Sequence, residues 1–301
     1  TVGGNQASRP ITDFGINVTD AYYVDSTDGD DGRAGTSPET ALATLDAAIN
    51  KCTANQGDII YVMPGHAETY TGTSGFDADV AGISIIGLGA GTDMPEFAFG
   101  TTTAGVCATV GAASVTFENL RFKAGISDVP IGVAVEAAGD NFTLKDCMFP
   151  EPTTSSFEFL DAIDLASGAD GITIDGCVYF NMDATGANHF MDAGNGVNND
   201  LTVKDSVIMG EFAVAAIWSD TADLEVLIDN CVIANATNGQ HAVEFTAAAT
   251  GAIRNCVLRT DAQATALDPG SLGVHSVLWD DDTTADDAGI PVIAASDDTS
   301  Y

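Results

Sequence analysis

A nine-residue pattern that recurs seven times constrains this chain more than any other feature. Each copy has an alternating apolar trio, a small or amide residue and a second short apolar run, as in residues 172–180. The copies begin at residues 83, 115, 142, 172, 201, 226 and 251, so successive copies are 25 to 32 residues apart. Repeats of this period are typical of stacked units that bury their apolar side chains only against their neighbours.

Each copy predicts two short strands on either side of a sharp bend. The bend position holds residue types that adopt a left-handed backbone at low cost, namely Gly87, Asn119, Asp146, Gly176, Asp205, Asn230 and Asn255. The following position is small or apolar, as expected for an inward-pointing column, and holds Leu88, Leu120, Cys147, Cys177, Ser206, Cys231 and Cys256. We therefore predict that these cysteines are buried free thiols packed as small hydrophobes.

A third, less regular strand is expected between copies, at residues 131–136, 159–165, 214–218 and 242–245. Three strands per coil and at least seven coils predict an all-β protein, a single-stranded parallel β-helix. Neighbouring coils would pair about 4.8 Å apart. The β-helix domain is expected at residues 21–279, with a last strand within 271–279, an N-terminal arm at 1–20 and an acidic C-terminal tail at 280–301.

The segment before the first copy predicts a strand at residues 22–24 and then an acidic loop at 25–32. The loop has oxygen ligands at alternating positions, as calcium loops do, but lacks the closing Glu. A solvated turn is therefore the favoured interpretation, and a calcium site is the alternative. Its candidate ligands are Asp25, Asp28, Asp30 and Asp31.

Start signals for a helix follow this loop. Ser37 and Pro38 suit the N-cap and first turn, and the apolar residues at 42, 45, 49 and 52 lie on one helical face. An amphipathic helix is thus predicted at about 38–53. It is well placed to cap the open end of the shaft, where unpaired strand edges would invite association.

Residues 22–65 carry a family resemblance. They read Tyr-Val-Asp, an Asp-Gly loop, Ser-Pro, a helix with Ala-Thr-Leu, and Gly-Asp-Ile-Ile-Tyr-Val-Met-Pro-Gly. This order, followed by coils, resembles the pectin-lyase-like superfamily of right-handed parallel β-helices over residues 21–260. The resemblance implies a right-handed helix. It leaves the activity open, because that superfamily includes lyases, hydrolases, phage tailspikes and non-catalytic virion proteins. The Asp-rich, Lys-poor composition also resembles β-helical structural proteins of marine phages.

The net charge of −35 excludes several classes of partner. Such a field repels nucleic acids, anionic membranes and acidic polysaccharides, and it suits proteins that work in salty water. No uncharged apolar run approaches membrane-spanning length, so membrane insertion is not expected. No basic segment followed by an apolar run opens the printed sequence, so no secretory signal is recognised in it.

This chain contains few of the catalytic motifs that enzymes of the resembling superfamily use. Pectate lyases use an Arg or Lys base beside a calcium cluster, and this chain offers only Arg254 and Arg259 on its late coils. The Gly-His-Gly and Arg-X-Lys segments of polygalacturonases are absent. Hydrolysis of a neutral glycan needs two carboxylates. The candidates beside the third strands are Asp161, Asp164, Asp192 and Glu244.

Three further expectations concern the carboxylates, the histidines and the aromatic residues. Asp161 and Asp164 differ by an odd step, so a straight strand would place them on opposite faces. The four histidines are scattered without ligand spacing and are expected at surfaces or turns. The aromatic residues Tyr179, Phe190, Trp218 and Trp279 are expected in a core stack rather than in a sugar-binding platform.

The leading functional hypothesis is a non-catalytic structural β-helix, exposed on a virion as a phage capsid decoration or spike protein. Its expected partners are further copies in a homotrimer and a capsid, tail or surface assembly. No cofactor is expected unless calcium binds the acidic loop. The alternative is a polysaccharide-degrading enzyme, such as a tailspike depolymerase, glycoside hydrolase or lyase that binds glycan. A third hypothesis is a secreted adhesin or filament subunit. Each places the protein on a virion surface or outside the cell.

Overall fold

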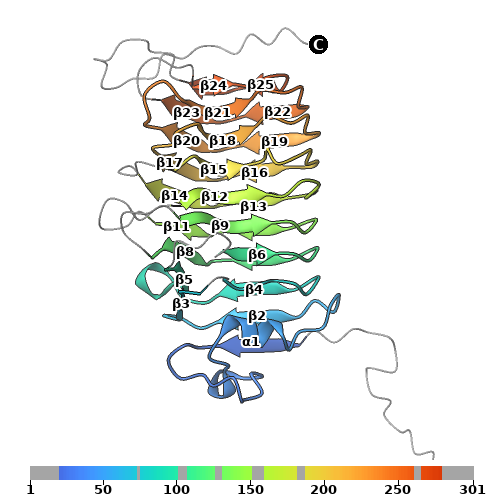
Figure 1. The fold of residues 1–301 in the computed structure, drawn as a ribbon, viewed down its shortest axis with the longest axis vertical. Coiled ribbons are helices and arrows are strands. Elements are labelled where there is room, and N and C mark those ends of the chain that lie inside the picture. The colour runs from blue at the N-terminus through green and yellow to red at the C-terminus, as the bar shows by residue number, and fades with distance from the viewer. Residues whose placement is uncertain are drawn as a thin grey trace, which may run out of the picture.

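The protein is described here from a computed structural model that covers residues 20–72, 75–100, 107–125, 131–150, 159–181, 187–260 and 266–279. Residues 1–19 and 280–301, which hold nearly all of the predicted arm and the whole predicted tail, lie outside this part. The described chain forms a parallel β-solenoid of about seven turns with three sheets. Strands of successive coils stack in chain order along the long axis (Figure 1).

The first two sheets contain the strands on either side of each bend. The first sheet is ten-stranded in the described part and comprises β1 (Ala21–Val24), β2 (Ile59–Val62), β4 (Ser84–Gly87), β7 (Thr116–Glu118), β10 (Thr143–Lys145), β13 (Thr173–Asp175), β16 (Thr202–Lys204), β19 (Val226–Asp229), β22 (Gly251–Arg254) and β25 (Gly273–His275). The second comprises β3 (Ala67–Tyr70), β5 (Glu96–Phe99), β8 (Arg121–Ala124), β11 (Met148–Phe149), β14 (Val178–Asn181), β17 (Val207–Gly210), β20 (Val232–Asn235), β23 (Val257–Thr260) and β26 (Leu278–Trp279).

The third sheet contains the predicted irregular strands. It comprises β6 (Ala108–Val110), β9 (Ile131–Ala137), β12 (Phe159–Leu165), β15 (His189–Asp192), β18 (Ala215–Ser219), β21 (His241–Phe245) and β24 (Leu267–Asp268). Three strands per coil are thus confirmed. The predicted last strand at 271–279 is resolved into two, β25 and β26, which add a further level to the stack.

The bends have the left-handed backbone that their residue types predict. The φ angles lie between 51° and 65° at Asn119, Asp146, Gly176, Asp205, Asn230 and Asn255. Each of these residues donates its backbone N–H to a carbonyl of the next coil, as from Asn119 to Lys145 and from Asn230 to Arg254. The bend therefore turns the chain and also links successive coils.

Gly87 is the exception, and its predicted bend is wrong. It lies within β4 and lacks a left-handed φ, and the glycines of this copy with positive φ are Gly89, at 104°, and Gly91, at 61°. A Cβ atom on Gly87 would lie 2.1 Å from the backbone oxygen of Asn119. Glycine is needed at position 87 because the next coil approaches closely, not because of its backbone conformation.

The column after the bends forms part of a continuous core, except for Leu88, which is partly exposed. The column members Leu120, Cys147, Cys177, Ser206, Cys231 and Cys256 are all at most 1% exposed. The six cysteines of the chain are free thiols. Burial raises the pKa of Cys177 to about 12, so this thiol is neutral at physiological pH.

The predicted helix at 38–53 is wrong in extent. The structure has a 3-10 turn, η2 (Pro38–Thr40), and a five-residue helix, α1 (Leu45–Ile49), that begins after the N-cap Thr44. Leu42 lies between them and forms a β-bridge with Val24, so the backbone at 42 pairs with β1 instead of continuing a helix. A second 3-10 turn, η3 (Gly91–Asp93), follows β4.

The short α1 packs beside β1 and β2 at the N-terminal end of the stack (Figure 1). Its residues Leu45, Ala48 and Ile49 are buried in the core. The right-handed sense of the coil and the capping role of this segment stay predictions. Within the described residues, no helix has the length and apolar character needed to cross a membrane.

Candidate active site on the third sheet

The third sheet presents acidic side chains outward because its strands bury two consecutive residues. In β12, Ala162 and Ile163 are both fully buried, and the flanking Asp161 and Asp164 both face outward and are partly exposed. Other strands of the sheet have a similar irregularity, with consecutive buried residues at 134–135 in β9, 215–217 in β18 and 242–243 in β21. The prediction that Asp161 and Asp164 lie on opposite faces is therefore wrong.

The strand register aligns these outward residues across successive coils. Asp164 pairs with Glu136 on one side and with Asp192 on the other. We name the resulting line the outer row, which consists of Glu136, Asp164, Asp192, Trp218, Glu244 and Asp268. Parallel stacking thus makes neighbours of residues that are 24 to 28 positions apart in the sequence.

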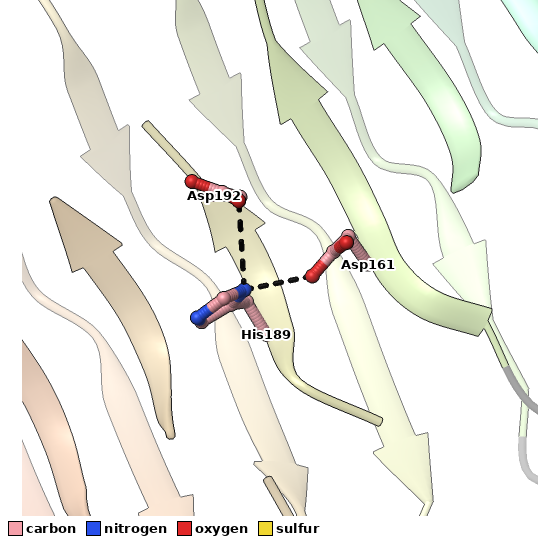
Figure 2. A group of neighbouring side chains, drawn as sticks. All are labelled: Asp161, His189 and Asp192. Carbon is pink, nitrogen blue, oxygen red and sulfur yellow. Dashed lines mark hydrogen bonds and ion pairs between the residues drawn. The ribbon is translucent and has the colours of Figure 1, made fainter. Parts of the chain in front are cut away.

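A second line of register partners, three residues earlier on β12 and β15, brings a histidine close to these acids. Asp161 on β12 pairs with His189 on β15, and His189 is three residues before Asp192. The Nδ1 atom of His189 lies 2.7 Å from Oδ1 of Asp161 and 3.8 Å from Oδ2 of Asp192 (Figure 2). We call these three residues the Asp-His-Asp cluster. Their ligand atoms all lie within 4.8 Å of one another, so they could hold a metal ion.

His189 is the most enclosed member of the cluster. Its side chain is 8% exposed, against 16% for Asp161 and 18% for Asp192. Its Nε2 atom is buried and has no hydrogen-bond partner, so the imidazole makes its polar contacts through Nδ1 alone. The expectation of a surface or turn role is wrong for this histidine. His66 does lie at a turn, since its N–H bonds to the carbonyl of Met63, but its side chain is buried and bonded to Ser26 and Glu68.

Trp218 borders the cluster. Its indole stacks on the imidazole of His189, with ring centroids 5.1 Å apart and planes 19° from parallel. Gly194 makes room for the indole, because a Cβ there would lie 2.1 Å from Cζ3 of Trp218. Trp218 is partly exposed and outside the core, so its predicted core role is wrong, whereas Tyr179 and Phe190 do pack together in the core. The side chain of Trp279 lies outside the described residues.

Burial and crowding of like charges perturb the carboxyls of the site. Burial raises the pKa of Asp164 to about 6, helped by the carboxylates of Asp192 and Asp161. Asn195 opposes part of this rise by donating an Nδ2–H to Asp164. Burial also raises the pKa of Asp192, although the N–H of Gly194 stabilises its ionised form. Asp164 is therefore able to exchange a proton near neutral pH.

Two other predicted groups lie apart from this cluster. Glu244 occupies the outer row, but Trp218 stands between it and Asp192 in the register. The acidic loop at 25–32 uses its carboxylates locally. Asp25 and Asp30 accept N–H groups of their own turns, and Asp31 accepts those of Ala43 and Thr44. Calcium binding in that loop stays a prediction.

The sequence contains one signal for His189, which is not among the sequence candidates, whereas Asp192 is. His189 and Asp192 lie in a segment that aligns with the predicted strands at 159–165 and 214–218 at the coil period. That alignment would have placed His189 beside Asp161. The stacking of Trp218 on His189 has no such signal, because it depends on how the indole folds over Gly194.

No protein-family description matches the chain, and no curated protein matches its sequence. Among solved structures, pectate lyase Pel9A is 16% identical, with a TM-score of 0.58 over 87% of this chain and 69% of that chain. The pectin methylesterase of Aspergillus niger is 17% identical, with a TM-score of 0.49 over 93% of this chain and 92% of that one. The GH136 lacto-N-biosidase of Eubacterium ramulus is 11% identical, with a TM-score of 0.46 over 85% and 67%. At these identities the likeness concerns architecture alone: this chain shares the parallel β-helix fold of pectate lyase Pel9A.

Proposed function

We propose that this protein is an enzyme that hydrolyses a neutral or amino-bearing glycan on the outer face of its third sheet. The observation that carries the proposal is the convergence of Asp161, Asp164, His189 and Asp192 beside the indole of Trp218. Glycoside hydrolysis needs one group that protonates the leaving oxygen and another that assists the attack of water. This face supplies ionisable groups for both tasks.

Each side chain has a role in this proposal. Asp164, with its pKa raised to about 6, is the proton donor to the leaving oxygen. Asp192 deprotonates the attacking water, and His189, fixed by Asp161 through the 2.7 Å contact, stands 3.8 Å from the Asp192 carboxylate and helps to position it. Trp218 offers an aromatic surface on which the apolar face of a sugar ring can stack.

The charge of the site supports a substrate without carboxylates. Within the described residues, the ion pairs of Lys and Arg involve Glu96, Glu118, Asp146, Asp175 and Asp229, all away from the third sheet. An anionic polysaccharide would meet the outer row without a compensating cation. Arg254 lies on the first sheet and Arg259 on the second, so neither is placed to serve as a base for elimination at this site.

The test compares glycan classes on the full chain. We expect new reducing ends from neutral glycans or glucosamine polymers, and no ultraviolet absorbance from unsaturated products. Asp164→Asn and Asp192→Asn should each lower the rate by about 100-fold or more. Glu244→Gln is the matched control, because it removes an acid of the same row beyond Trp218. Unsaturated products from uronate polymers, or no cleavage of any glycan in the panel, would contradict the proposal.

A structural role is the second candidate, and the net charge of −35 favours it. A strongly charged, rigid shaft suits an exposed, well-solvated part of a virion or surface assembly. In that case the protein co-sediments with such particles as a homotrimer, and the Asp164→Asn variant assembles like the wild type. An adhesin or filament subunit would instead polymerise through its ends.

A further inference from the structure

We propose that the Asp-His-Asp cluster binds one divalent first-row transition-metal ion, through Nδ1 of His189 and one carboxylate oxygen each from Asp161 and Asp192. This site goes beyond the proposed hydrolysis and does not depend on it, because metal binding is measured without any glycan.

The separations of the donor atoms suit a shared ion. Two ligand atoms that each lie about 2.1 Å from one metal can be at most about 4.2 Å apart. The distances from Nδ1 of His189, 2.7 Å to Asp161 and 3.8 Å to Asp192, are within this limit. The three donors all lie within 4.8 Å of one another, so any remaining adjustment is at most about half an ångström. Figure 2 shows both carboxylates directed toward the same ring nitrogen.

The strands hold these donors in place. Asp161 and His189 are register partners on adjacent strands, and Asp192 follows on β15 with its Oδ1 accepting the N–H of Gly194 at 2.7 Å. That bond leaves Oδ2, the oxygen facing His189, available to a ligand. Trp218 covers one face of the imidazole and limits its rotation. The three ligand side chains are therefore already ordered, so metal binding would cost little conformational entropy.

The chemistry of the donors selects the class of metal. Calcium and magnesium prefer all-oxygen sites, whereas an imidazole with carboxylates suits manganese, cobalt, nickel or zinc. The acidic loop at 25–32 has only oxygen donors. A preference for Co²⁺ or Zn²⁺ over Ca²⁺ therefore distinguishes binding at the Asp-His-Asp cluster from binding at the acidic loop or at other acidic surfaces.

Two observations, independent of the distances, also point to a cation. The cluster lies beside Asp164 on a face with no described ion pair to Lys or Arg. His189 is more than nine-tenths buried, and its Nε2 has no partner, so its one polar attachment is directed into the cluster. A divalent ion would offset the repulsion between the two carboxylates and bind the enclosed imidazole.

The experiment uses the full chain after treatment with a chelator. Titration with Co²⁺, followed by visible absorption and calorimetry, should give one tight equivalent that tenfold excess Ca²⁺ does not displace. His189→Gln should weaken this binding by at least about tenfold. His241→Gln, one histidine on the same sheet two coils further on, is the matched control and should bind like the wild type. Circular dichroism verifies that both variants are folded.

A second measurement needs no variant. Pulsed electron paramagnetic resonance of bound Mn²⁺ should detect coupling to an imidazole nitrogen in the wild type. Equal Co²⁺ affinity of wild type and His189→Gln, displacement by Ca²⁺, or a spectrum without nitrogen coupling would each overturn the proposal and indicate binding to acidic surface groups only. Tight Co²⁺ binding without glycan cleavage would support the metal site and contradict the hydrolase. Glycan cleavage without metal binding would support the hydrolase and contradict the metal site.

Discussion

At the residue scale, the bend positions explain why the coils turn where they do. Asn, Asp and Gly adopt φ near +55° at low cost, and each bend donates its N–H to the coil above. The side chains of the bends add contacts between coils, as where Asn230 donates an Nδ2–H to Asp205 at 2.6 Å. A bend residue therefore contributes through its backbone conformation and through its amide or carboxylate group.

Replacing Asn230 separates these two contributions. Asn230→Gly and Asn230→Val both remove the hydrogen bond to Asp205, but only valine is strained at φ 54°. We expect the valine variant to be about 1–2 kcal/mol less stable than the glycine variant. Urea denaturation of the two proteins measures the difference. Equal stabilities would show that the left-handed backbone at this bend is not the constraint.

The carboxyl of Asp164 gives a prediction for pH. Because its pKa is about 6 in the folded protein and near 3.9 in an unfolded chain, the stability linked to this group is fully present below about pH 4. That stability is lost as the pH rises through 6. Asp164→Asn removes the titration, so the wild type should lose stability relative to this variant between pH 4 and pH 7.

The size of this effect is limited by solvent. Asp164 is partly exposed, so we expect a change of about 1 kcal/mol or less in the difference between the two unfolding free energies. Denaturation curves of both proteins at pH 4, 5, 6 and 7 give that difference directly. A difference that stays constant or grows in favour of the wild type with rising pH would contradict the raised pKa.

At the scale of elements, a stack of aromatic rings joins the coils inside the shaft. Phe117 on β7 contacts three other phenylalanines, with centroids 5.7 Å from Phe76, 6.2 Å from Phe122 and 5.1 Å from Phe142. The stack continues to Phe149 and Tyr179 in later coils. The three-residue strands β7, β10, β13 and β16 each bury a single side chain, so these contacts between coils hold such strands together.

Truncation of Phe117 tests this dependence. Phe117→Ala should destabilise the protein by about 3–5 kcal/mol, because the side chain is fully buried and its neighbours cannot close the cavity. Phe117→Leu should cost less, since it keeps most of the volume. Thr116→Ala, at the adjacent outward position of β7, is the control and should change stability by about 0.5 kcal/mol or less. Similar losses for the alanine and leucine variants would argue against cavity formation as the cause.

At the scale of the whole molecule, charge dominates behaviour in solution. Forty-four acidic residues face nine basic ones, and the basic residues on the first sheet already pair across coils, as Lys145 does with Glu118 at 2.7 Å. The remaining acids repel one another, and this repulsion favours the expanded, unfolded chain. Dissolved salt screens such repulsion over distances of about 10 Å at 0.1 M.

Stability should therefore increase with ionic strength. We expect the melting temperature to rise steadily from low salt to about 0.5 M, with equal effects of sodium chloride and potassium chloride. Differential scanning calorimetry across both salt series measures this. A melting temperature that falls with salt would mean that favourable ion pairs outweigh the general repulsion.

The repeat and the bends could be read from the sequence because their causes are local. A left-handed bend needs Asn, Asp or Gly at one position. Inward-facing residues of a strand are apolar and recur at every second position. The residue type alone therefore predicts the bend conformation of Asp146 and Gly176 and the burial of Cys177. Gly87 has the same residue type but meets a different constraint, the approach of the Asn119 carbonyl, which no local pattern reveals.

The sequence by itself determined the all-β class, the coil period, the buried cysteine column and the position of the third strands. Only the tertiary structure decided that Asp161 and Asp164 share a face and that Trp218 stacks on His189 beside them. The physical reason is that a bend depends on a few adjacent residues. The site depends instead on the register between coils and on the two consecutive buried residues of β12, Ala162 and Ile163, which pack into the core.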